Sequence, residues 1–118
     1  MKYFRSTISA IGLVLLSHAF INPAYAIDCR KAETQIDRAI CKNHELFEVD
    51  SQLNSVYQSV LGSVGRQSIS GKRIVKSQRR WKARRNFAWQ NRKGGCYRDD
   101  ECLILMHEER IAELEGSR

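Results

Sequence analysis

Apolar residues recur at steps of three and four positions along much of the chain, which is the spacing of one face of an α-helix. The most regular stripe predicts a helix over about residues 44–64, with Asn43 as its N-cap. This stripe consists of Leu46, Val49, Leu53, Val56, Tyr57, Val60 and Val64. A second stripe predicts a last helix that begins at Asp99 or Asp100. It consists of Leu103, Met106, Ile111 and Leu114.

A third helix is predicted between these two, over about residues 72–91, with a sparser apolar face. That face contains Ile74, Val75, Trp81, Ala88 and Trp89, and Gln78 and Arg85 lie on or near it. Residues 65–71 are rich in Gly and Ser and are expected to form a loop, and Gly94-Gly95 is expected to end the helix.

The segment before residue 44 predicts a turn followed by one short helix. Residues 27–33 are expected to be extended or turn-like. Thr34 can cap a helix that runs through Cys41, with Asp37 at the acidic position of a capping box. No strand-like alternation and no Asn-Gly or Asp-Gly hairpin signal occurs. The sequence therefore predicts an all-α fold, a small antiparallel helical hairpin or bundle of about four helices.

The first 26 residues have the features of a secretory signal peptide that is cleaved. A positively charged start is followed by an apolar stretch from Ile8 to Ile21, and Ala24-Tyr25-Ala26 offers small residues for cleavage. The apolar stretch is shorter than the roughly 20 residues of a confident membrane span. A retained N-terminal anchor is the alternative. We expect a periplasmic or secreted protein, not an integral membrane protein, with a single domain over residues 27–118.

All four cysteines lie beyond this segment, at Cys29, Cys41, Cys96 and Cys102. An even number of cysteines in an exported domain indicates disulfides. Of the three possible pairings we favour Cys29–Cys41 and Cys96–Cys102, because the members of each pair are close in sequence. A continuous helix from Cys29 to Cys41 would separate their Cα atoms by about 18 Å, so the chain must fold back between them. A zinc site is the alternative, although it would need C-x-x-C-like pairs.

Ten lysines and arginines, and no acidic residue, lie between residues 72 and 93. The predicted surface for an anionic partner consists of Lys72, Arg73, Lys76, Arg79, Arg80, Lys82 and Arg84. An acidic protein, lipid headgroups or an anionic envelope polymer would suit it, whereas export argues against nucleic acid as the physiological partner. The alternative is a solvated face with some arginines paired to acids of the last helix, such as Glu108, Glu109, Glu113 and Glu115.

Asp50 lies at the edge of the apolar stripe of the helix over residues 44–64. Arg85 falls one turn after Trp81 on the helix over residues 72–91. A charge in a small core is costly unless it is paired and hydrogen-bonded. We therefore expect a structural ion pair between Asp50 and Arg85, or between Asp50 and Arg110, that fixes the register of the helices.

The sequence predicts no enzyme, and neither a cofactor nor a metal site. A thiol nucleophile would need a free cysteine and a histidine base. The cysteines are expected to be oxidised, and His44 and His107 lie in different predicted helices, where each is expected at the surface or a boundary. Zinc-protease, serine-hydrolase and phosphate-loop motifs are absent from the sequence.

An ordered set of residues resembles the LprI-like lysozyme-inhibitor domain family of small secreted bacterial helical domains. The set is Asp28-Cys29, Thr34 with Ile40-Cys41, Leu46-x-x-x-Asp50-x-x-Leu53-Asn54-x-x-Tyr57, Gln78-Arg79-x-Trp81-x-x-x-Arg85-Asn86, Cys102-Leu103 and Glu109-Arg110-Ile111-x-x-Leu114. The resemblance covers almost all of residues 27–118. It implies a bacterial protein of the periplasm or cell surface that binds and inhibits a lysozyme-type muramidase.

Net charge bears on that implied partner. The chain carries +7, and loss of Lys2 and Arg5 with the signal leaves +5. Lysozymes are commonly cationic, so an inhibitor with this charge would need a local acidic patch, for example Asp99 to Glu101 with Glu108. The second hypothesis is an envelope-associated module whose basic helix, residues 72–93, binds an anionic lipid, an anionic polymer or an acidic protein.

Overall fold

The computed structural model describes residues 27–118, and the predicted signal segment lies outside this range. The elements are the 3-10 turn η2 (Cys29–Lys31) and the helices α1 (Gln35–Lys42), α2 (His44–Val64), α3 (Ile69–Gln90) and α4 (Asp100–Glu115). The described part of the chain contains no strand. The predicted all-α fold of about four helices is therefore confirmed.

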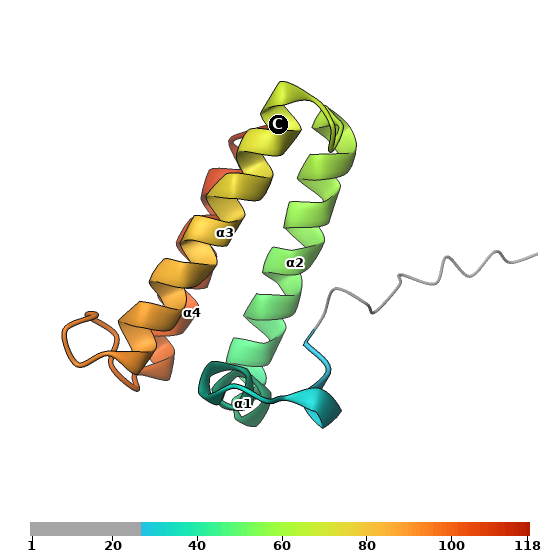
Figure 1. Ribbon diagram of the computed structural model, residues 1–118. Coiled ribbons are helices and arrows are strands. Elements are labelled where there is room, and N and C mark those ends of the chain that lie inside the picture. The colour runs from blue at the N-terminus through green and yellow to red at the C-terminus, as the bar shows by residue number, and fades with distance from the viewer. Residues whose placement is uncertain (1–26) are drawn as a thin grey trace, which may run out of the picture.

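The long helices form an antiparallel bundle that α1 closes at one end. Figure 1 shows α2 and α3 running in opposite directions, with α4 behind α3 and the short α1 at the end where α2 begins. Helix α4 packs more extensively against α2 than against α3, and α1 contacts both α2 and α3. The three long helices thus surround one core, and α1 lies across its lower end in the view.

Each of the helices α1 to α4 begins after a residue whose side chain caps it. The capping side chains of Thr34, Asn43, Ser68 and Asp99 accept hydrogen bonds from the backbone N–H three residues later, at 3.1, 3.1, 2.9 and 3.1 Å. Each bond satisfies a donor that the helix itself leaves without a partner. The helix starts predicted at Thr34, Asn43 and Asp99 are therefore confirmed.

The start of α3 differs most from the sequence-based prediction. We expected a loop over residues 65–71, but the helix already begins at Ile69, because Ser68 caps it. Gly71 is helical and closely packed: a Cβ atom there would lie 2.1 Å from the carbonyl oxygen of Gly65. This glycine therefore permits a close approach of two backbone segments and does not end a helix.

The core is built from apolar side chains of all four α-helices. Its least exposed members are Ile36, Ile40, Leu46, Leu53, Val60, Leu103 and Leu114, and Trp81 and Trp89 of α3 pack with them. Leu61 and Ile104 are also buried, although neither belongs to a predicted stripe. Leu61 directly follows Val60 in α2, and Ile104 directly follows Leu103 in α4. The buried face of each of these two helices is therefore wider than its predicted apolar stripe.

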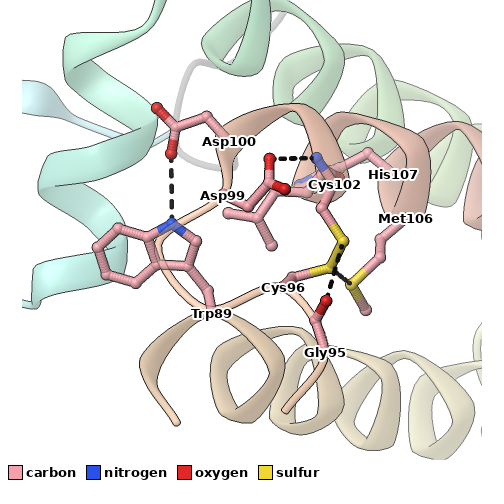
Figure 2. Close-up of a disulfide and its surroundings, with 9 residues drawn as sticks. Trp89, Gly95, Cys96, Asp99, Asp100, Cys102, Met106 and His107 are labelled. Carbon is pink, nitrogen blue, oxygen red and sulfur yellow. Dashed lines mark hydrogen bonds between the residues drawn. A yellow bond between two sulfur atoms is a disulfide. The ribbon is translucent and has the colours of Figure 1, made fainter. Parts of the chain in front are cut away.

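Both predicted disulfides are present. Cys29–Cys41 joins η2 to the end of α1, with 5.7 Å between the Cα atoms, because the chain folds back before α1 begins. Cys96–Cys102 fastens the loop after α3 to the first turn of α4, with 5.5 Å between the Cα atoms. Figure 2 shows this second disulfide beside Met106. All cysteines of the described chain are thus paired, which excludes the zinc alternative.

The close approach at Gly71 generates a stability prediction. Gly71→Ala should lower the free energy of unfolding by about 1–3 kcal/mol, because the new methyl group would meet backbone atoms of Gly65 and Arg66. Gly62→Ala is the matched control: it lies in α2 with no atom within 4 Å of the added Cβ, and it should stabilise the protein by up to about 1 kcal/mol. Urea denaturation measures both, and equal effects would contradict the prediction.

Candidate functional site

A buried cluster of polar side chains connects the three long helices. One oxygen of Asp50 on α2, Oδ1, accepts a hydrogen bond from Arg85 of α3 at 3.2 Å and lies 3.1 Å from Nε2 of His107 on α4. Asp50 is 8% exposed, Arg85 6% and His107 0%. The structure therefore brings the predicted pair together and adds a histidine to it.

We expected His107 at the surface or at a boundary, but it is completely buried. Its Nδ1 lies 2.7 Å from the carbonyl oxygen of Leu103, and its ring is nearly perpendicular to that of Trp81, with 5.0 Å between ring centroids. His107 is four residues after Leu103 and four before Ile111, so the helical spacing does place it on the apolar stripe of α4. That spacing was the signal that the sequence analysis overlooked.

Arg85 is held on several sides. Its Nε and one terminal nitrogen donate to Oδ1 of Asn86, at 3.1 and 3.0 Å, and its guanidinium lies 5.5 Å from the ring of Trp81. Burial lowers the pKa of Arg85, and the charge of Asp50 opposes that shift. The buried guanidinium therefore depends on Asp50 for electrostatic compensation.

Arg110, the alternative partner that we considered for Asp50, belongs to a second polar cluster. It donates to Gln78 at 2.9 Å, to Ser77 at 2.9 Å and to Glu113 at 2.9 Å. This cluster joins α4 to α3. In the described residues, every buried side-chain nitrogen and oxygen has a hydrogen-bond partner.

The predicted basic surface lies on the outside of α3. All seven of its side chains are exposed, and we call this set the α3 basic face: Lys72, Arg73, Lys76, Arg79, Arg80, Lys82 and Arg84. Within residues 27–118, no salt bridge joins any of them to an acidic residue of α4. The expected alternative of arginines paired across to α4 is thus not observed there, and the acid Glu113 pairs with Arg110 of its own helix.

Helix α4 carries the opposite charge. Glu101, Leu105, Glu108 and Glu115 are exposed and recur at helical steps of three, four and seven residues, so they share one side of α4, and Glu109 flanks it. We call these five residues the α4 acidic face. Leu105 is 59% exposed and lies between Glu101 and Glu108 along the helix. The face therefore combines a large apolar side chain with surrounding carboxylates.

Two further features bear on what the chain can do. No helix within residues 27–118 has the length and apolar character needed to span a membrane. Over the same residues, no group of three or more His, Cys, Asp or Glu side chains is arranged to hold a metal ion. The α3 basic face and the α4 acidic face belong to adjacent helices of the bundle (Figure 1).

The buried cluster generates a stability prediction. Asp50→Ala should lower the free energy of unfolding by about 3–5 kcal/mol, because Arg85 would remain buried without its carboxylate and His107 would lose a partner. Thermal and urea denaturation of the two proteins measure the difference.

The matched control is Glu48→Ala, which removes a carboxylate that pairs with His44 on the exposed side of the same helix. This change should leave the stability almost unaltered. An Asp50→Ala protein as stable as the Glu48→Ala protein would contradict a structural role for the pair.

The comparison with known protein families gives a match over most of the chain. The family model described as lysozyme inhibitor LprI matches residues 28–114, which includes η2 and nearly all of the four α-helices. No curated protein and no solved structure gave a match. The matched range contains both disulfides and the Asp50, Arg85 and His107 cluster. The chain belongs to the LprI lysozyme inhibitor family.

Proposed function

We propose that this protein is exported and acts as a non-enzymatic inhibitor of a lysozyme-type muramidase, which it binds through the α4 acidic face. The observation that carries the proposal is the family match over residues 28–114. The four cysteines of that range form two disulfides, which are typical of proteins in oxidising compartments outside the cytoplasm. The signal-like segment over residues 1–26 supports the same location.

The distribution of charge supports α4 as the binding surface. The protein is basic as a whole, and a cationic lysozyme would be repelled by the α3 basic face. Helix α4 contains six acidic residues and one arginine, so it is the helix whose potential complements a cationic partner. Glu101, Glu108 and Glu109 are exposed and available to lysines and arginines of such a partner.

Leu105 offers an apolar contact within the α4 acidic face. It is one of the few large apolar side chains that the described chain leaves well exposed, at 59%. Interfaces commonly gain most of their binding energy from a few central, well-packed side chains, and the contacts around them exclude water. Leu105 with glutamates on either side has that arrangement.

A charge-reversal experiment tests the proposal. The oxidised protein should inhibit bacterial cell-wall lysis by a strongly cationic lysozyme. The double variant Glu101→Lys/Glu108→Lys should bind at least about tenfold more weakly, because it places like charges against the enzyme. Leu105→Ala should also weaken binding by about tenfold or more. Inhibition assays and isothermal titration calorimetry measure both effects.

The matched control reverses two charges on the other long helix. Lys76→Glu/Arg80→Glu lies on the α3 basic face and should leave inhibition unchanged or strengthen it. Full lytic activity at micromolar concentrations of the oxidised wild-type protein would refute inhibition of the enzyme used. Equal inhibition by the wild type and the α4 variant would refute the assignment to α4.

A second candidate function rests on the α3 basic face. Its seven exposed cations have no salt-bridge partner within the described residues, so they are free to bind an anionic component of the cell envelope. Adsorption to vesicles that contain an anionic phospholipid should then fall steeply with added salt and should be weakened by Lys76→Glu/Arg80→Glu. Adsorption that this variant leaves unchanged would exclude the α3 basic face as the binding surface.

A further inference from the structure

A groove at the α1 end of the bundle lies apart from both of these faces. It has a volume of about 500 Å³, within the size range of small-ligand sites, and its lining comes from α1, the end of α3, the following loop and the start of α4. The lining residues are Gln35, Arg38, Ala39, Lys42, Trp89, Arg98 and Asp100. Three of these side chains are cationic and one is acidic.

We propose that this groove binds a small polyanion that carries two or more carboxylate or phosphate groups. Arg38 and Lys42 approach it from α1, and Arg98 approaches it from the loop between α3 and α4. Within the described residues, none of these three side chains forms a salt bridge with a carboxylate. Arg38 donates to the backbone oxygen of Glu33 at 2.6 Å, which leaves its charge uncompensated.

Arg98, which lines the groove, has an unusual backbone conformation. Its φ angle is +51°, the left-handed region that side chains other than Gly seldom adopt. The backbone N–H of Arg98 donates to the carbonyl oxygen of Trp89 at 3.0 Å, and Cys96–Cys102 ties the loop to α4. The guanidinium consequently lies 5.4 Å from the ring of Trp89 and 5.7 Å from that of Tyr97. Strained residues of this kind are concentrated at functional sites.

The acidic member of the lining is already engaged. Trp89 donates from its indole nitrogen to Oδ1 of Asp100 at 3.2 Å, and Asn43 donates to Oδ2 at 3.4 Å. Figure 2 shows the indole nitrogen of Trp89 directed at Asp100. Asp100 is thus held as part of the wall, and three cations face one fixed carboxylate. The groove therefore has an excess of positive charge that a multivalent anion would neutralise.

The same geometry argues against a neutral ligand. A neutral ring has no open aromatic face to stack on, because Trp89 is only 7% exposed and Arg98 lies over its ring. Carboxylate and phosphate groups, in contrast, match the planar donors of two arginines.

Titration followed by NMR spectroscopy tests the proposal. Citrate and pyrophosphate, one probe for each kind of anionic group, are added to the oxidised protein at a constant ionic strength of about 150 mM. We expect a saturable shift of the indole N–H signal of Trp89, which lines the groove, and little change at Trp81. The probe with the tighter binding identifies carboxylate or phosphate as the preferred group.

Three variants make the test specific. Arg98→Gly introduces a residue that readily adopts the left-handed backbone conformation, so the fold should be preserved. Because the guanidinium is lost, binding should weaken at least about tenfold. Lys42→Gln, on α1, should weaken binding in the same direction without touching that loop. Arg66→Gln removes an exposed cation between α2 and α3, outside both the groove and the α3 basic face, and should leave the affinity unchanged.

Two results would overturn the proposal. One is the absence of a saturable shift for both probes below about 10 mM. The other is an equal loss of affinity in Arg66→Gln and Arg98→Gly, which would show that overall charge governs binding and the groove does not. Because the groove shares no residue with the α4 acidic face, either result leaves the proposed inhibition of lysozyme unaffected.

Discussion

The arrangement of the bundle depends on the carboxylate of Asp50. It is buried on α2 and is contacted by Arg85 from α3 and by His107 from α4, so one side chain connects all three long helices. Apolar packing tolerates small rotations of a helix, whereas a buried ion pair loses its compensation when either partner moves. This contact therefore favours one rotation of α3 and α4 about their axes, and with it the directions in which the α3 basic face and the α4 acidic face point.

Much of the fold can be predicted from helix capping residues, apolar stripes and cysteine spacing. Thr34, Asn43 and Asp99 are capping residues placed before helical stripes, and the cysteines are close enough in sequence to predict their pairing. Ser68 was missed because two glycines around it suggested a loop, although Gly71 is needed for close packing inside the helix. His107 was missed because a polar residue type was given more weight than its position on the stripe.

The candidate sites were predictable only in part, because some consist of neighbouring residues and others combine segments that are distant in sequence. The α3 basic face is a run of neighbouring residues, so the sequence shows it directly. The groove is assembled from Arg38 and Lys42 of α1 and Arg98 of a loop more than fifty positions later, and neither the capping pattern nor the apolar stripes bring those segments together. Its key feature is a φ angle of +51° at Arg98, which the residue type itself disfavours.

The separation of charge between α3 and α4 makes the domain an electric dipole as well as a net cation. Helix α3 contains eight basic and no acidic residues, and α4 contains six acidic residues and a single arginine. The field of a highly charged partner would rotate such a molecule during approach, before any atoms touch. The same domain would therefore present α4 to a cationic surface and α3 to an anionic one. The sign of its total charge would affect the rate of association more than the orientation of the domain during approach.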